Sequence, residues 1–306
     1  AVIVFIKMAI VLIFIAVGWQ FIDVANHTPY FIPADAPDAI QPDGEAYSYL
    51  PSFNHGFLGV MRGAAIVFFA FIGFDAVSTA AQEAKNPKKD MPIGILGSLA
   101  ICTLLYILFS HVLTGVAPYS EFVTSGKEAS VAYAIEHHMP GYEWLAKVVT
   151  VAILAGFSSV ILVMLMGQSR VFFSMSNDGL LPKAFSALHP KFRTPYKANL
   201  ILFVFVGLFA AFVPGSVAGD LTSFGTLLAF VLVSAGVWLM RKSDPSANRP
   251  FRTPAVPFVS TMGVLICTAM ILSIDPRTLL IALLWMVLGL GIYFGYSKNT
   301  SNLRQN

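Results

Sequence analysis

Charge is scarce in this sequence. Only 11% of its 306 residues are Asp, Glu, Lys or Arg, whereas 57% are hydrophobic, and the mean hydropathy is +0.74. A soluble domain has about 45–50% apolar residues, so a soluble enzyme is excluded. Cysteine is scarce too: the sequence has two, Cys102 and Cys267, and both lie in apolar runs. This excludes a disulfide scaffold. The basic residues form short separate clusters, which excludes a nucleic-acid-binding face.

Long apolar runs dominate the chain. A helix that crosses the hydrocarbon core of a bilayer needs about 20 mostly apolar residues, which satisfy their backbone polar groups internally. The runs are continuous, whereas the strands of a membrane barrel would alternate. The sequence therefore predicts an all-α polytopic membrane protein, with one transmembrane domain over residues 1–306. Its eight predicted spans are residues 1–22, 63–81, 92–116, 148–169, 198–219, 221–240, 257–274 and 278–297.

The loops between the spans predict an orientation. Clusters of Lys and Arg follow the second, fourth and sixth spans, within residues 85–89, 170–197 and 241–252. Loops rich in Lys and Arg face the cytoplasm, so both ends of the chain are predicted to be cytoplasmic, in a bacterial plasma membrane. The chain begins with Ala1 in the middle of an apolar run, and it is therefore interpreted as a C-terminal fragment of a longer protein.

The second span contains the stretch Phe68-Phe69-Ala70-Phe71-Ile72-Gly73-Phe74-Asp75. A charged Asp at mid-span costs about 2.5–3.5 kcal/mol, so it is expected to face protein or water. Gly73 favours a helix break, after which the first half-helix would end in carbonyls carrying roughly half a negative charge. Such an end suits an ammonium group. The pattern predicts a substrate site at Gly73 and Asp75; alternatively, Asp75 only caps the second half-helix.

Lys7 is the second charge within a span. Burial favours the neutral form of an amine, so a lysine inside a membrane is a candidate proton carrier. The alternative is that its long side chain extends to the cytoplasmic surface. From the residues alone the two interpretations are equally supported.

Two charges near the cytoplasmic ends of spans predict an inner gate. Glu83 follows the second span and Arg170 follows the fourth, so the two side chains could pair and close the inner side. The alternative is that both are solvated interfacial charges, which contribute little to stability.

Several motifs indicate a family. The run from Phe69 through Asp75, then Glu83-Ala84-Lys85-Asn86-Pro87 with Pro92 following, resembles the amino acid–polyamine–organocation permeases. Residues 167–170, 178–182 and 189–195 resemble the cationic amino acid transporter branch of that superfamily. The resemblance covers the whole chain. It implies a partial LeuT-type inverted-repeat fold, in which the eight spans match helices five to twelve of about twelve.

The resemblance also implies roles for individual residues. On the unwound part of the substrate helix it places Phe69, Ala70, Ile72, Gly73 and Asp75. Lys7 matches a helix-five lysine that occupies the position of a sodium ion in proton-coupled members. Ser158 and Ser159, in the matching helix eight, are expected to line the same pocket. A fixed ammonium repels a sodium ion, which favours a proton as the coupling ion.

Histidines do not suggest a metal site. His27, His55, His137 and His138 lie in predicted outer loops, and His111 is alone in the third predicted span. None has the spacing of metal ligands, so neither a metal nor another cofactor is expected.

Together these features predict a secondary active amino acid transporter that takes up its substrate with a proton by alternating access. Its expected partners are a small amino acid and the lipid bilayer, without nucleic acid. A non-transporting truncated fragment and a polyamine or organocation transporter are the alternatives. A channel is disfavoured because the last four spans hold no charge, and a membrane enzyme because the spans hold few reactive groups. The sequence leaves the amino acid and the oligomeric state open.

Overall fold

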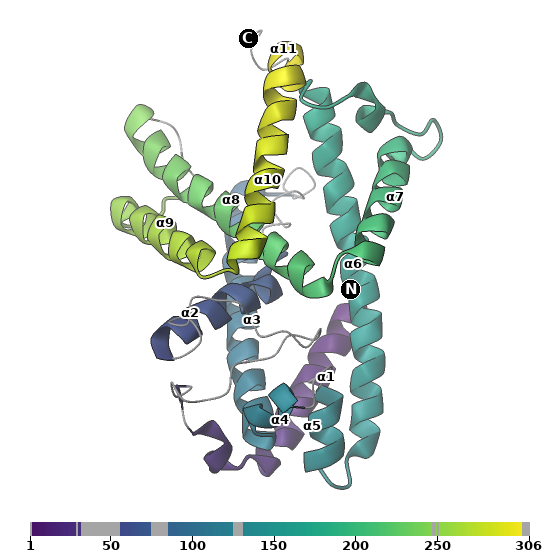
Figure 1. Ribbon diagram of the computed structural model, residues 1–306, viewed down its shortest axis with the longest axis vertical. Helices are drawn as coiled ribbons and strands as arrows, with labels where there is room; N and C mark the ends of the chain where they lie inside the picture. Colours follow the sequence, from purple (N-terminus) through teal and green to yellow (C-terminus); the bar gives the residue numbers. More distant parts are fainter. Residues whose placement is uncertain are drawn as a thin grey trace. The chain divides into compact units, whose positions relative to one another are not determined.

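The computed structural model describes residues 2–28, 30–31, 56–74, 85–124, 131–246, 249 and 251–301. Every regular element among these residues is a helix (Figure 1). The predicted all-α polytopic class is therefore confirmed. The chain divides into two compact units, one of residues 1–60 and 96–162 and one of residues 61–95 and 163–306. They are called unit 1 and unit 2 below, and each is described by itself.

Five helices in the described part of the chain are long and apolar enough to cross a membrane. They are Ile3–Phe21, Pro87–Val116, Glu143–Asn177, Val217–Ser243 and Pro276–Thr300. Three shorter apolar helices are Gly56–Phe71, Tyr196–Phe212 and Val256–Leu272. Every predicted span overlaps one of these helices. The count of eight spans and the LeuT-type repeat stay predictions.

Many large apolar side chains on these helices are exposed. Phe203 on α7 (Tyr196–Phe212) is 75% exposed, and Leu162 on α6 (Glu143–Asn177) is 69% exposed. In water such surface would cause association, whereas in a bilayer it faces lipid of similar polarity. The exposed apolar surface therefore agrees with helices that lie in a membrane.

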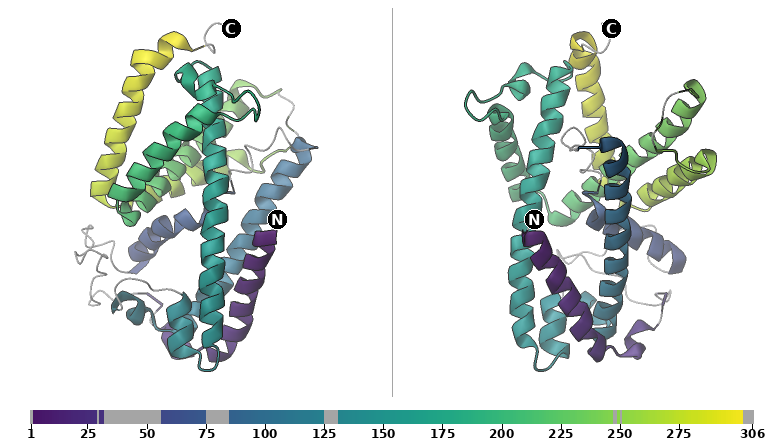
Figure 2. Two further views of the ribbon diagram at one scale, coloured as in Figure 1. Left: turned by 90° about the vertical axis from the view of Figure 1, so that its right-hand side faces the viewer. Right: turned by 180° about the vertical axis from the view of Figure 1, so that it is seen from behind.

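Unit 1 is built around the packing of α1 (Val2–Gly18) on α3 (Pro87–Val116), seen side by side in Figures 1 and 2. Phe14 is 1% exposed and its ring lies 4.8 Å from that of Phe109. Gly18 permits the close approach, because a Cβ there would lie 2.6 Å from a methyl group of Val112. Beyond α1 the chain forms the 3-10 turns η1 (Trp19–Phe21) and η2 (Val24–His27). The core of unit 1 also includes α5 (Val131–His138) and the first part of α6.

Unit 2 has its own smaller core. It forms where the end of α2 (Gly56–Val67) meets α8 (Gly215–Ser243), the loop before α10 (Pro276–Ile292) and α10 itself. Along α8 lies α9 (Val256–Leu272), and a Cβ at Gly263 would lie 2.8 Å from the hydroxyl of Ser234. Small residues at such a contact let two helices approach closely within a membrane.

The end of unit 2 is tied to the loop after α6. After α10 the chain makes a π-helical turn, η7 (Tyr293–Ser297), and the short helix α11 (Lys298–Thr300). The Ser297 hydroxyl donates to the Leu180 carbonyl at 2.7 Å, and the Thr300 hydroxyl donates to the Gly179 carbonyl at 2.7 Å. Gly179 has φ of +78°, a conformation that favours glycine. The segment Asp178-Gly179-Leu180 is therefore held by the last helical turns of the described chain.

Candidate functional site

The predicted substrate helix loses its helical conformation before Gly73. Helix α2 ends at Val67 and continues as the 3-10 turn η4 (Phe68–Phe71). Ile72 is extended, with φ −62° and ψ 130°, and its N–H donates to the Phe69 carbonyl at 3.2 Å. Gly73 has φ of +124°, which a residue with a side chain adopts only at a cost. The last carbonyls of η4 thus lie at a helix end, where negative partial charge accumulates.

Apolar side chains of unit 2 surround this helix end. The ring of Phe230 on α8 lies 5.8 Å from that of Phe68, edge to face, and 5.5 Å from that of Phe74. A Cβ at Gly73 would lie 3.1 Å from the terminal methyl group of Met164 on α6. The helix end therefore combines backbone carbonyls, which suit a cationic amine, with aromatic and thioether surface, which suits an apolar group.

The predicted substrate residues fall partly within the described chain. Phe69, 53% exposed, and Ala70 lie exposed on η4, whereas Ile72 and Gly73 are half-buried. Asp75 lies outside the described residues, and so does the predicted second half of the helix. The role of all five residues in substrate binding stays a prediction.

Lys7 contacts α6, the helix that carries Ser158 and Ser159. Its Nζ, half-buried on α1, donates to the Gly156 carbonyl of α6 at 3.2 Å. Gly156 is buried, and a Cβ there would lie 2.9 Å from Lys7 Cε. The absence of a side chain at position 156 therefore lets the amine reach the α6 backbone.

The two serines of the predicted coupling pocket differ. The Ser159 hydroxyl donates to the same Gly156 carbonyl at 2.8 Å, so Ser159 and Lys7 share an acceptor. Ser158 is exposed, and its hydroxyl donates to the Leu154 carbonyl of its own helix at 3.0 Å. The structure thus brings Lys7 and Ser159 together and directs the Ser158 hydroxyl elsewhere. Their role in coupling stays a prediction.

The other predicted sites are less fully described. Arg170 lies half-buried on α6, whereas Glu83 lies outside the described residues, so the inner gate stays a prediction. Among the described residues, no group of three or more His, Cys, Asp or Glu side chains could hold a metal ion.

Sequence reasoning missed Gly156, Met164 and Phe230. Each lies far along the chain from the residue that it contacts, and each is an ordinary residue of an apolar run. Gly156 alone had a detectable signal, because small residues in membrane helices often mark close contacts.

The helices and their apolar surfaces define an integral membrane protein. A family model described as amino acid permease matches residues 1–295. The chain belongs to this amino acid permease family, within the amino acid–polyamine–organocation superfamily. The family and the relatives are transporters and not enzymes.

Three curated relatives illustrate the range of the family. The chain is 40% identical over 302 residues to the branched-chain amino acid permease BcaP of Bacillus subtilis, covering 99% of this chain and 59% of the relative. It is 36% identical over 304 residues to the methylthioribose transporter of the same bacterium, covering 99% and 60%. Against the vacuolar cationic amino acid transporter 4 of Arabidopsis thaliana it is 35% identical over 198 residues, covering 64% and 32%. The chain spans about three fifths of the length of the first two relatives.

Proposed function

We propose that the full-length protein is a secondary active transporter that takes up an amino acid together with a proton by alternating access. The observation that carries this proposal is the interrupted substrate helix at Ile72 and Gly73. Transporters build substrate sites from such discontinuous helices, whose freed carbonyls and helix ends bind the charged groups of the substrate. In this proposal the carbonyls at the end of η4 bind the substrate amino group, and Asp75 adds a negative charge.

Proton coupling is proposed from the contact between Lys7 and Gly156. Ionisable side chains inside membrane proteins pair with one another or with backbone carbonyls, and they mark proton pathways. A carbonyl at 3.2 Å accepts a hydrogen bond from either the ammonium or the neutral amine. In this proposal Ser159 supports the same acceptor, and the proton is the coupling ion without any other cofactor.

The proposed substrate is an amino acid with an apolar side chain. Phe68, Phe230 and Met164 supply apolar surface beside the helix end. BcaP, 40% identical over nearly the whole chain, carries a name that specifies branched-chain amino acids. The proposed location is a bacterial plasma membrane. Both ends of this sequence are proposed to be cytoplasmic, because loops rich in Lys and Arg face the cytoplasm.

Uptake in proteoliposomes tests this function. The full-length gene product is reconstituted and given labelled leucine, lysine, putrescine or methylthioribose, with and without an inward proton gradient. The proposal predicts saturable leucine uptake that the gradient stimulates. No uptake of any amino acid by a folded sample would contradict it, and uptake of methylthioribose or putrescine alone would replace the proposed substrate.

Two variants test the mechanism within that assay. Asp75→Asn removes the proposed charge beside the amino group, and Lys7→Ala removes the proposed proton carrier. We expect Asp75→Asn to weaken leucine uptake with and without the gradient, whereas Lys7→Ala abolishes only the stimulation by the gradient. The exposed Lys147→Ala serves as the control for loss of a positive charge. Unchanged gradient-driven uptake in both variants would contradict the mechanism.

A further inference from the structure

Two histidines of unit 1 lie against each other. His111, alone in the third predicted span, stacks its ring on that of His27, with centroids 4.5 Å apart and planes 1° from parallel. The ring of Trp19 lies tilted beside that of His111, with centroids 5.6 Å apart. His27 belongs to η2 and His111 to α3, so the stack joins the segment after α1 to the end of α3.

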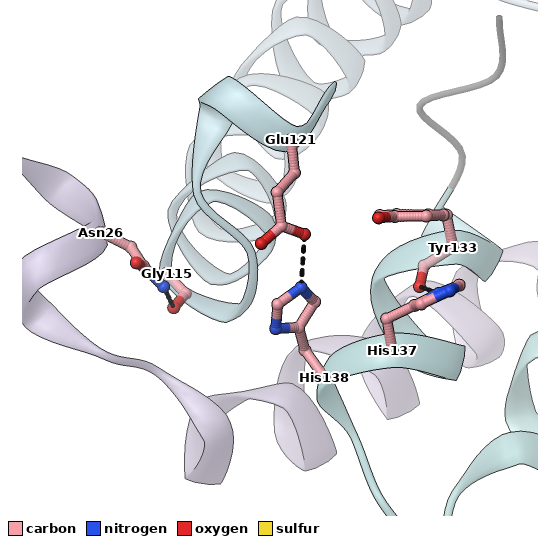
Figure 3. Close-up of polar contacts among 6 residues, drawn as sticks. All are labelled: Asn26, Gly115, Glu121, Tyr133, His137 and His138. Atoms are coloured by element: carbon pink, nitrogen blue, oxygen red, sulfur yellow. Dashed lines mark hydrogen bonds and ion pairs between the residues drawn. The ribbon is translucent and has the colours of Figure 1, made fainter. Parts of the chain in front are cut away.

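Hydrogen bonds reinforce this junction. The His27 Nε2 lies 3.0 Å from the His111 carbonyl. Since a carbonyl only accepts, Nε2 must donate, which leaves Nδ1 of His27 as the nitrogen that can take up a proton. The Gly115 carbonyl accepts from the Asn26 side chain at 2.9 Å (Figure 3). It also accepts from the backbone N–H of Asp23 at 2.9 Å.

The junction is tightly packed as well. A Cβ at Gly115 would lie 2.8 Å from a methyl group of Ile22 and 3.0 Å from Cε1 of His27. The segment from Trp19 to His27 therefore fits closely on α3, and any force that separates the two rings acts on the whole segment.

We propose that the His27–His111 stack is an acid-sensitive clasp that holds the segment from Trp19 to His27 on α3 at neutral pH and releases it in acid. Histidine is the side chain whose charge ordinarily changes between about pH 5 and 8. Two neutral rings stack favourably. When both carry a proton, two positive charges face each other across 4.5 Å. In this proposal their repulsion exceeds the strength that the charge adds to the hydrogen bond from His27 to the His111 carbonyl, so the stack opens.

Within the part of the chain that the structure describes, no hydrogen bond or ion pair joins a carboxylate to either histidine ring of the stack. Asp23 is the acidic residue nearest in sequence, and its carboxylate accepts from the N–H of Ala25 within its own turn. Of the more distant carboxylates, that of Glu121 pairs with His138 and that of Glu143 accepts from the N–H of Gly141. On α4 (Tyr119–Thr124), α5 and the start of α6, the groups with acidic or basic side chains are Glu121, Glu136, His137, His138, Glu143 and Lys147.

A second histidine contact in unit 1 responds to acid in the opposite direction. His138 Nε2 lies 2.7 Å from a Glu121 carboxylate oxygen, joining α5 to α4 (Figure 3). Protonation of His138 turns this contact into a charge-assisted pair, which is stronger. Acid therefore tightens the α4–α5 contact while it releases the segment after α1, so α5 is an internal reference for any general loosening.

The link between the clasp and transport rests on the proposed function. The clasp lies in the predicted outer part of the chain, on the side from which protons enter during uptake. Release in acid would therefore free the segment after α1 when protons are available to drive uptake. Lys7 carries the proton in this scheme, and the clasp only makes the rate depend on outside pH.

Hydrogen exchange on the full-length protein in lipid nanodiscs tests the clasp without requiring transport. Exchange of residues 19–28 is compared at about pH 8 and about pH 5.5, values on either side of the histidine range, after correction for the intrinsic pH dependence of exchange. We expect the corrected exchange of this segment to rise several-fold in acid, while that of α5 does not rise.

Two variants remove the titration and keep the neutral contacts. His27→Gln retains a side-chain donor for the His111 carbonyl, and His111→Phe retains a flat ring for stacking. We expect both to abolish the acid response of residues 19–28, whereas the control His137→Gln keeps it. Wild-type exchange that does not change with pH, or an equal acid response in whichever of the two variants folds, would overturn the clasp.

Uptake separates the clasp from the proposed function. Leucine uptake by His111→Phe in proteoliposomes is expected to lose part of its dependence on outside pH and to keep its stimulation by the gradient. If hydrogen exchange responds as expected but no amino acid is taken up, the clasp stands and the proposed function fails. Identical pH profiles of uptake for wild type and His111→Phe would overturn the link to transport.

Discussion

The two units hold their candidate functional groups in different ways. In unit 1, Lys7 reaches a carbonyl of another helix, and its position depends on the packing of α1 and α6 around a buried glycine. In unit 2, the predicted substrate helix is interrupted by its own backbone, with Ile72 extended and Gly73 at φ of +124°. A substitution in unit 1 should therefore act through displaced side chains, whereas one in unit 2 should act through backbone strain.

The largest loss of leucine uptake is expected on substitution of Gly73. An alanine at φ of +124° is strained by about 1–3 kcal/mol, and its Cβ would press on Met164 at 3.1 Å. Because about 1.4 kcal/mol corresponds to tenfold, leucine uptake by Gly73→Ala should fall about tenfold to a hundredfold. Gly63→Ala is the matched control, since Gly63 lies in helical α2 with no atom near its Cβ position. Wild-type uptake by Gly73→Ala would show that the break needs no special conformation.

The next largest effect is a loss of stability on substitution of Gly179. Alanine in the left-handed conformation costs about 1–2 kcal/mol, and its Cβ would collide with the Thr300 carbonyl. We expect the thermal unfolding temperature of Gly179→Ala to drop clearly. Gly141→Ala is the control, because Gly141 has φ of +86° but nothing within 4 Å of its Cβ position. An equal drop in both variants would mean that strain alone matters and that the contact with α11 adds nothing.

At Gly156 we expect a smaller effect on coupling and little on stability. The Cβ of Gly156→Ala would lie 2.9 Å from Lys7 Cε, the far end of a flexible side chain, so the amine moves and loses its carbonyl. One hydrogen bond contributes about 1 kcal/mol, so gradient-stimulated uptake should fall several-fold. Gly167→Ala on the same helix, with nothing within 4 Å, should behave as wild type. Retained coupling in Gly156→Ala would dissociate Lys7 from the coupling step.

The smallest expected change is in the proton dependence of uptake, and it should differ between two neighbouring serines. Ser159 shares the Gly156 carbonyl with Lys7, whereas Ser158 bonds its own helix at Leu154. We therefore expect Ser159→Ala to lower the proton dependence of uptake by about twofold to threefold, consistent with part of one hydrogen bond. Ser158→Ala should leave it unchanged. The opposite order, measured as initial rates at several outside pH values, would contradict this assignment.

Hydropathy made the helices predictable, but not all of their ends. Every predicted span overlaps a helix, since length and apolarity are local properties of the chain. Helix α2 nevertheless begins at Gly56, before the predicted start at residue 63. Arg62, just before the predicted start, lies inside this helix and is only 9% exposed. Hydropathy places a span boundary at a charged residue, whereas in the folded unit Arg62 is buried within the helix.

Pairings between distant segments were harder to predict. Gly73 was expected to interrupt its helix because glycine and a following Asp are a local signal. Lys7 was linked to the Ser158–Ser159 region by family resemblance, but its Gly156 acceptor was not found. The contacts of Phe230 with Phe68 and of His27 with His111 join residues separated by long stretches of sequence. A single sequence taken by itself carries no signal for such contacts.

Proton entry during uptake tests the central claim most directly. The full-length protein is reconstituted in liposomes that contain a pH-sensitive dye, and leucine is added outside without any imposed gradient. The account predicts that leucine acidifies the interior of wild-type liposomes, and that Lys7→Ala takes up leucine without acidification. Leucine uptake with no proton movement in the wild type, or equal acidification in Lys7→Ala, would contradict the assignment of Lys7 as the coupling residue.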